Sequence, residues 1–245
     1  MKLITATPSP FARKVRVALL EKNISYEEII DIPWNSNTKT NGINPLGKIP
    51  ILLLKDQEPM FDSKVINQYL DYLEPNPLLY PRSFQENISA RLLETVADGI
   101  CDSVVLVFLE NSRNKDLRSK NWIKRQEKKI FEGVEYLSNY LKDQQFFVGN
   151  SFSIADISCF SCLEYIDLRF PKFEWKNIAD FELLESLIYV RNGELVLDGK
   201  LKINVNDFNK VYKFLLTPKN YRNEIKHFCN INNFINNNIK KTIVI

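Results

Sequence analysis

The sequence predicts an α/β domain at its N-terminus and an all-helical domain after it. Two observations carry this prediction: strand and helix patterns alternate through about the first 75 residues, and long helical patterns follow a proline-rich segment. With 245 residues, of which 44% are hydrophobic and 26% charged, the chain can bury a sizeable core. We expect a domain over residues 1–75, a linker over 76–85, a helical domain over 86–180 and a tail over 181–245.

The first elements are a strand, a helix and a second strand. Residues 2–7 are β-prone, and the following segment carries apolar residues at a helical spacing: Phe11, Val15, Ala18 and Leu19. Ser9 occupies the expected N-cap position and Pro10 the first helical position, where proline loses no intrahelical hydrogen bond. The helix should end near residues 22–23, and residues 26–32 provide the second strand. This order and length indicate a parallel βαβ unit.

The next strand contains a proline. Residues 49–54 have the pattern of a buried strand in which Pro50 cannot donate a ladder hydrogen bond. Either Pro50 begins the strand, or its peptide bond is cis and turns the chain at a functional edge. A short run at residues 58–61 can pair with this strand across a turn. Ser63 is then a plausible cap of a helix with an apolar stripe of Val65, Ile66, Tyr69, Leu70 and Leu73.

Helical patterns dominate the second domain. Their periodicity predicts two long helices, over residues 85–110 and about 117–141. Ser153 and Asp156 have the spacing of a capping box, so a further buried helix should run from Ser153 to about residue 168. After residue 180, strand-like runs alternate with Asn-Gly and Asp-Gly turns, and an Asn-rich end follows. We expect this atypical tail to be part β or disordered.

Composition and motifs exclude several classes of function. No Gly-rich nucleotide-binding loop is present, and the single histidine, His227, cannot supply a zinc site of two or three imidazoles. The net charge of +3 is too small to indicate nucleic acid, and the longest apolar runs are far shorter than the ~20 residues of a membrane span. Because a β-prone run follows Met1 directly, with no signal-peptide pattern, we expect a cytoplasmic protein. Cys159 and Cys162 have redox spacing, but two small core residues are the simpler interpretation.

Three motifs carry a family resemblance. Residues 9–11 (Ser-Pro-Phe), 44–50 (Asn-Pro-Leu-Gly-Lys-Ile-Pro) and 61–63 (Phe-Asp-Ser) follow one another in the order and spacing of the cytosolic glutathione S-transferases. The chain resembles bacterial members with a serine-type active site up to about residue 180. The resemblance implies a thioredoxin-like N-terminal domain that binds glutathione, an all-α C-terminal domain that forms most of the electrophile pocket, and a homodimer. Glutathione would be a co-substrate, and no metal would be needed.

The resemblance also assigns roles to individual residues. Ser9 would be the catalytic residue that stabilises the glutathione thiolate, and the peptide bond before Pro50 would be cis. The backbone of Ile49 would bind the cysteinyl part of glutathione, while Asp62 and Ser63 would hold its γ-glutamyl amine and carboxylate. The full set of expected glutathione-binding residues is Phe11, Lys48, Ile49, Pro50, Asp62 and Ser63.

Elementary energetics support the role of Ser9. A free thiol with a pKa of ~8.5 is about 3% thiolate at neutral pH, and lowering that pKa to ~6.5 takes roughly 2.7 kcal/mol. A hydrogen bond to a charged group contributes about 1.5–3 kcal/mol and a helix N-terminus about 0.3–2 kcal/mol. Ser9 at the head of its helix is placed to provide both. Ser63 at a helix start suits a carboxylate for the same reason.

Each role has a structural alternative. Ser9 is also a favoured helix cap, and the pair Asp62-Ser63 has the same ambiguity. Lys48 is either a ligand of the glycyl carboxylate of glutathione or a solvated loop lysine. Apolar residues of the first long helix, Phe108 among them, either line the electrophile pocket or fill the core.

The expected function is therefore conjugation of the glutathione thiolate to a small hydrophobic electrophile, a detoxification reaction. The alternative is a non-catalytic adaptor of the same fold that binds a protein partner such as RNA polymerase, as the stringent-starvation proteins do. Thiol-transfer enzymes of the superfamily carry cysteine where this chain has Ser9, and serine cannot form a mixed disulfide, which disfavours that activity. We expect neither a nucleic-acid nor a membrane partner.

Overall fold

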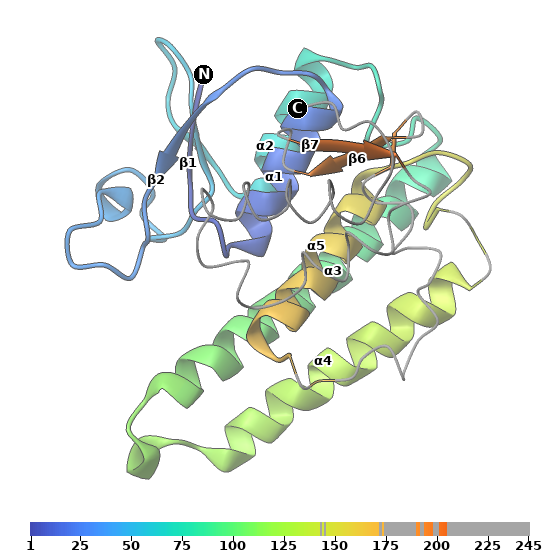
Figure 1. Ribbon diagram of the computed structural model, residues 1–245. Coiled ribbons are helices and arrows are strands. Elements are labelled where there is room, and N and C mark those ends of the chain that lie inside the picture. The colour runs from blue at the N-terminus through green and yellow to red at the C-terminus, as the bar shows by residue number, and fades with distance from the viewer. Residues whose placement is uncertain are drawn as a thin grey trace. The chain divides into compact units, whose positions relative to one another are not determined.

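A computed structural model describes residues 1–142, 144, 146–171 and 173, and the backbone of three strands between residues 190 and 204. The first 180 residues form one compact unit and residues 181–245 a second one. Within the first unit, a four-stranded mixed sheet precedes a group of helices (Figure 1). This arrangement confirms the predicted thioredoxin-like domain followed by an all-α domain.

The sheet of the first unit has the strand order β2-β1-β3-β4. Strand β1 (Lys2–Thr5) pairs in parallel with β2 (Glu27–Ile30) and antiparallel with β3 (Ile51–Leu53). The short β4 (Met60–Phe61) pairs antiparallel with β3. The predicted parallel βαβ unit is therefore confirmed, and Pro50 lies directly before β3, so that its missing N–H interrupts no ladder.

Two helices accompany the sheet, and their N-termini are capped in different ways. Helix α1 (Pro10–Glu21) is capped as predicted, since the Ser9 Oγ accepts a hydrogen bond from the amide of Ala12 at 3.2 Å. The prediction that Ser63 caps the next helix is wrong. Ser63 is the first residue of α2 (Ser63–Leu73), and Asp62 is its cap, with Oδ1 accepting from the amide of Lys64 at 2.8 Å. Ser63 already lies inside the helix, so the capping position falls one residue earlier, where the carboxylate of Asp62 reaches the amide two residues on.

Among the described residues, the helical part contains three long α-helices: α3 (Phe84–Ser112), α4 (Lys120–Leu141) and α5 (Ile154–Arg169). Helix α3 packs against both α4 and α5, and α5 in turn packs against α1, as Figure 1 shows. Short 3-10 helices lie at Thr40–Gly42 (η1) and Lys115–Leu117 (η2).

The start of α5 is fixed by the predicted capping box. The Ser153 side chain accepts from the first turn, and Oδ2 of Asp156 accepts from the Ser153 amide and hydroxyl, both at 2.8 Å. The other oxygen of Asp156 accepts from the amide of Phe147 at 2.9 Å. Burial raises the pKa of Asp156 to about 6, although these hydrogen bonds oppose the shift. Asp156 is thus structural, as its position in the motif predicts.

Buried ion pairs hold the N-terminal helix against the helical part. The Lys14 ammonium of α1 lies 2.7 Å from Asp98 and 3.1 Å from Glu94, both on α3. Burial by itself would lower the pKa of Lys14, but the two carboxylates outweigh burial and the pKa is raised. Arg13 pairs with Glu164 of α5 at 2.6 Å. These contacts fix the N-terminus of α1, and with it Ser9, against α3 and α5.

A second buried cation organises the connection after α2. The Lys22 ammonium is buried and donates to Asp71 at 2.7 Å and to the backbone oxygens of Glu74 and Pro77 at 2.6 and 2.8 Å. Asp71 also accepts from the amides of the two residues that begin the next segment, Leu79 and Tyr80. The boundaries of the linker at 76–85 remain a prediction.

Three short strands are described in the tail. Strands β5 (Val190–Arg191), β6 (Glu194–Leu197) and β7 (Leu201–Asn204) form an antiparallel meander. The expectation of disorder in the Asn-rich end, together with His227, falls outside the described residues. Among the helices that are described, none is long and apolar enough to span a membrane.

Candidate functional site

The first segment of the site is the turn that leads into α1. The Ser9 amide donates to the carbonyl of Ala6 at 2.9 Å, and the Ser9 carbonyl accepts from the Arg13 amide at 3.0 Å. With backbone angles in the extended region, Ser9 stands at the positive end of the α1 dipole. Its Oγ accepts from the Ala12 amide through a lone pair, so the hydroxyl proton remains able to point outward.

The second segment is the loop that carries residues 44–50. The side chain of Asn44 makes two hydrogen bonds within this loop: its Nδ2 donates to the carbonyl of Lys48 at 2.7 Å, and its Oδ1 accepts from the amide of Leu46 at 2.9 Å. Gly47 has a φ of +59°, and an added Cβ there would lie 2.6 Å from Oδ1 of Asn41, so glycine is required. The Ile49–Pro50 peptide bond is cis, as the resemblance predicts.

The third segment is the start of α2. Asp62 is exposed and has a φ of 68°, a conformation that few residues other than glycine adopt, and the surrounding contacts must hold it there. Ser63 follows in the first helical position and is buried. Its position places its hydroxyl and the first backbone N–H groups of α2 at a positive helix end, where an anion is favoured.

A small cavity of about 140 Å³ joins these segments to α3. Its wall combines charges of both signs: Lys48 and Lys64 with Asp62, Asp98 and Asp102. Apolar and neutral residues complete the lining: Phe11, Asn44, Leu46, Ile49, Pro50, Phe61 and Ser63. Such a mixture of charges suits a small zwitterion better than an ion of one sign.

The two acids from α3 differ in their surroundings. Asp98 is held by Lys14 at 2.7 Å and by Lys64 at 3.3 Å, so its charge is compensated inside the protein. Asp102 has no ion-pair partner within 4 Å among the described residues. Burial raises the pKa of Asp102, while the charge of Lys48 opposes the shift. Asp102 is therefore the acid more readily available to a ligand.

A larger cavity of about 590 Å³ adjoins the first one and opens on Ser9. The two cavities share Phe11, Leu46, Lys48, Ile49 and Asp102. The remaining wall is mostly apolar and is formed by Ala6, Pro8, Pro10, Ile32, Pro33, Trp34, Gly47, Val105, Leu106, Leu109, Tyr165 and Arg169. A hydroxyl at a helix N-terminus thus faces an apolar space that is large enough for a small organic molecule.

Aromatic rings support the wall of the larger cavity. Trp34 stacks on Phe108 with ring centroids 5.9 Å apart, and the Arg169 guanidinium lies over the same Phe108 ring at 4.0 Å. Phe108 therefore lies behind the wall and holds two lining residues in place. It neither lines the pocket directly nor packs only in the core, so neither of the two alternatives from the sequence describes it fully.

All seven residues singled out from the sequence lie around these two cavities. Ser9 lines the larger one, Pro50, Asp62 and Ser63 line the smaller one, and the other three lie on the shared wall. Sequence reasoning missed several lining residues: Trp34, Lys64, Asp98, Asp102, Tyr165 and Arg169. For the α3 acids a signal existed, because they lie four residues apart and therefore on one helix face.

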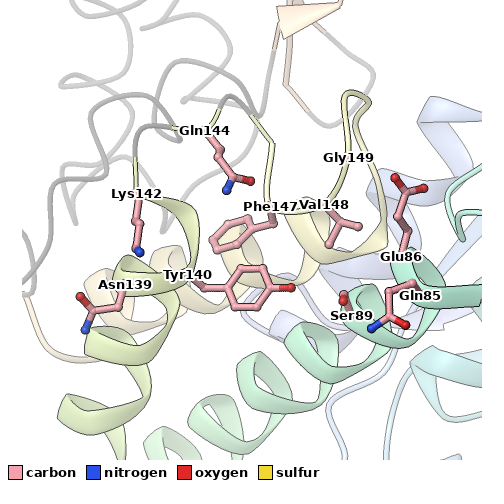
Figure 2. A pocket seen from close by; sticks show the side chains of 10 residues that line it. All are labelled: Gln85, Glu86, Ser89, Asn139, Tyr140, Lys142, Gln144, Phe147, Val148 and Gly149. Atoms are coloured by element: carbon pink, nitrogen blue, oxygen red, sulfur yellow. The ribbon is translucent and has the colours of Figure 1, made fainter.

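A separate hollow of about 410 Å³ lies between the first turns of α3, the end of α4 and the loop before α5 (Figure 2). In Figure 2 the Tyr140 ring crosses the hollow with its hydroxyl directed toward Ser89, and Glu86 stands beside Gly149. This hollow shares no lining residue with the two cavities near Ser9, so it is not part of that site.

The cysteines of the described residues do not contribute a nucleophile to the site. Cys101, Cys159 and Cys162 are free and buried. Burial raises the pKa of the Cys101 and Cys159 thiols well above the ordinary value, so both stay protonated. No group of three or more metal-binding side chains occurs in the part of the chain that the structure describes.

Comparison with known proteins agrees with this geometry. The family model described as the N-terminal domain of glutathione S-transferase matches residues 8–73, and the model of its C-terminal domain matches residues 120–186. The chain is 33% identical over 169 residues to the uncharacterized GST-like protein YibF of Escherichia coli K12, covering 69% of this chain and 83% of YibF.

Solved structures give the same result. A glutathione S-transferase of Methylobacterium radiotolerans, in complex with glutathione sulfonate, is 36% identical with a TM-score of 0.70, covering 78% of this chain and 96% of that one. A glutathione S-transferase of Methylobacillus flagellatus with bound glutathione is 34% identical with a TM-score of 0.71, covering 75% and 90%. With both family domains matched and the fold shared, this chain belongs to the glutathione S-transferase family.

Proposed function

We propose that the protein conjugates the thiolate of glutathione to a small hydrophobic electrophile, with Ser9 stabilising the thiolate. The observation that carries this proposal is the placement of the Ser9 hydroxyl, at the N-terminus of α1, on an apolar cavity that shares a wall with a cavity of mixed charge. One cavity suits the zwitterionic end of glutathione and the other suits an electrophile.

The smaller cavity would hold the γ-glutamyl group. Its ammonium would contact the carboxylates of Asp62 and Asp102, and its carboxylate would bind the Ser63 hydroxyl at the start of α2. The backbone of Ile49 would bind the cysteinyl part, and the exposed Lys48 would reach the glycyl carboxylate. The solved relatives in complex with glutathione and glutathione sulfonate support this ligand class.

Thiolate stabilisation would use the side of Ser9 that faces the larger cavity. Because Oγ accepts from the Ala12 amide, the hydroxyl is polarised and its proton is free to donate to sulfur. The α1 N-terminus adds a favourable field for the same negative charge. The apolar wall would bind the electrophile and exclude water from the attacking sulfur.

Calorimetric titration with reduced glutathione tests the proposal. The wild type should bind saturably, and Ser63→Ala should weaken binding by about ten-fold, the size of one hydrogen bond to a charged group. Ser158→Ala is the matched control, because Ser158 is a buried helical serine that lines neither cavity, and it should bind as the wild type does. A folded wild type that binds no glutathione would overturn the proposal and favour the adaptor alternative.

We also propose that the protein is a homodimer, as the family resemblance implies. Phe84, Ile88 and Leu92 recur every four residues on one face of α3 and are 79%, 48% and 48% exposed. A second copy of the chain would cover this face. Light scattering should give twice the chain mass for the wild type and a lower mass for Phe84→Asp, whereas Phe131→Asp on α4 should leave the mass unchanged. A monomeric wild type would contradict this assignment.

A further inference from the structure

The wall of the larger cavity includes one cationic side chain that takes no part in the proposed contacts with glutathione. Of the charged residues in its wall, Lys48 and Asp102 also line the smaller cavity, but Arg169 lines the larger cavity alone. Arg169 is the last residue of α5. It therefore belongs to the part of the wall reserved for the second substrate.

Arg169 is held by rings instead of by an anion. Its guanidinium carbon lies 4.0 Å from the centre of the Phe108 ring and 5.3 Å from that of Tyr165. Its Nε is buried and has no hydrogen-bond partner among the residues that the structure describes. Within the described residues no carboxylate lies within ion-pair distance of Arg169, whereas Arg13 and Arg16 each have one.

The surroundings explain why this cation is tolerated without a partner. The C-terminal end of α5 carries the negative end of the helix dipole, which favours a positive side chain. Burial raises the pKa of Tyr165, although the charge of Arg169 and its hydrogen bond to the phenol oppose the shift, so the phenol remains neutral and keeps its own O–H donor. The wall around both side chains is otherwise largely apolar. An anion that enters this space would find two donors side by side, the guanidinium N–H groups and the phenol hydroxyl.

We infer that Arg169 binds a carboxylate on the electrophile, so that the preferred second substrate is an apolar molecule with an anionic end. This inference rests on the proposed function and names its substrate class. A planar guanidinium presents paired N–H donors that match the two oxygens of a carboxylate. Asp102, on the wall shared with the smaller cavity, repels the same group, so the anionic end is directed to Arg169, which lines the larger cavity alone, and the reactive carbon to the Ser9 side.

The chemistry that this orientation serves is a conjugate addition. An α,β-unsaturated carbonyl compound accepts the glutathione sulfur at its β-carbon, the carbon–carbon π bond breaks, and the α-carbon takes a proton from water. The new carbon–sulfur bond replaces the π bond and no group leaves. The anionic end takes no part in the bond changes, so Arg169 is a specificity residue and not a catalytic one.

The test measures binding and does not depend on turnover. S-benzylglutathione and its 3-carboxy and 4-carboxy benzyl derivatives are titrated into the wild type, Arg169→Gln and Arg91→Gln. Arg91 is the matched control, because its guanidinium lies 4.8 Å from the Tyr80 ring but lines neither cavity. We expect the wild type and Arg91→Gln to bind one carboxylated derivative at least ten-fold more tightly than S-benzylglutathione, and Arg169→Gln to lose that preference.

The outcomes distinguish failure of this inference from failure of the proposed function on which it rests. If the wild type binds S-benzylglutathione but gains nothing from either carboxylate, the inference is wrong while the proposed function stands. If a preference exists and survives Arg169→Gln, another group provides it and the inference is again wrong. If no derivative binds, both the function and the inference fail. Arg169→Lys, which retains the charge, should keep part of the preference and serves if the glutamine variant does not fold.

Discussion

Replacement of Ser9 by alanine separates its two roles. The Ser9 Oγ accepts a hydrogen bond from the Ala12 amide at 3.2 Å, so its loss should lower the free energy of unfolding by about 1 kcal/mol, as for other helix caps. The catalytic proposal adds a second effect. Loss of a hydrogen bond of about 1.5–3 kcal/mol to the thiolate should raise the pKa of the bound thiol by roughly 1–2 units.

The second effect has a defined pH dependence. If the thiol pKa moves from ~6.5 to ~8, the thiolate fraction at neutral pH falls from about three quarters to about one tenth. The conjugation rate at neutral pH should fall by the same factor, about eight-fold, and the loss should shrink as the pH rises above the new pKa. The ultraviolet absorbance of the bound thiolate and the pH profile of the rate both measure this shift.

Ser119→Ala provides the matched control. Ser119 caps α4 through a hydrogen bond from the Trp122 amide, also at 3.2 Å, and lines neither cavity. Both variants should lose similar stability, but only Ser9→Ala should shift the thiol pKa. If Ser9→Ala lowers stability alone and leaves the thiol pKa and the rate profile unchanged, Ser9 is only a helix cap and the catalytic reasoning is refuted.

Three further predictions concern stability and are measured by chemical denaturation. The pKa of Asp156 is raised from 3.8 to about 6 in the folded protein, so protonation of this carboxyl favours the folded state: the contribution to the free energy of unfolding is complete below pH 3.8 and is lost as the pH rises through 6. Asp156→Asn should therefore reduce the slope of the free energy of unfolding against pH in this range, and an unchanged slope would refute the assignment. Asp71→Ala removes the carboxylate that accepts from two amides and neutralises the buried Lys22 ammonium, which then keeps only two backbone oxygens as acceptors, so we expect the free energy of unfolding to fall by about 3–5 kcal/mol; a loss below about 1 kcal/mol would contradict this. An added Cβ at Gly133 would lie 2.5 Å from the Ile100 side chain, so Gly133→Ala should destabilise the protein by about 1 kcal/mol, whereas Gly99→Ala, where the Cβ meets nothing within 4 Å, should stabilise it; a gain in both would show that the α3–α4 contact is not tight.

Local sequence patterns predicted most of the described helices and strands of the first unit. The wrong prediction, at the start of α2, was also a local one. Ser9 with Pro10, and Ser153 with Asp156, marked helix starts because a cap and its partner amide lie within one turn. At α2 two neighbouring residues were both capable of capping, and the pattern selected Ser63 instead of Asp62. The choice depends on a φ of 68° at Asp62, which the spacing of apolar residues does not determine.

The residues of the candidate site also fall into those that local motifs predicted and those that they did not. Residues 9–11, 44–50 and 61–63 were found because each is a contiguous motif with its own turn or cap chemistry. Trp34 and Arg169 were missed because neither belongs to such a motif. Tertiary packing brings both onto the Phe108 ring, which stacks on Trp34 and lies beneath the guanidinium of Arg169.

The sequence alone thus determined which segments become strands and helices, where most helices begin, and which short motifs carry polar groups suited to glutathione. These properties depend on hydrogen bonds and apolar spacing within a few residues of the chain. The tertiary structure alone decided that the motifs surround two adjoining cavities and that an arginine with no carboxylate partner among the described residues faces the larger one. Those properties depend on the packing of α1 against α3 and α5, where the buried Lys14 must meet carboxylates that lie 80 and 84 residues away in the sequence.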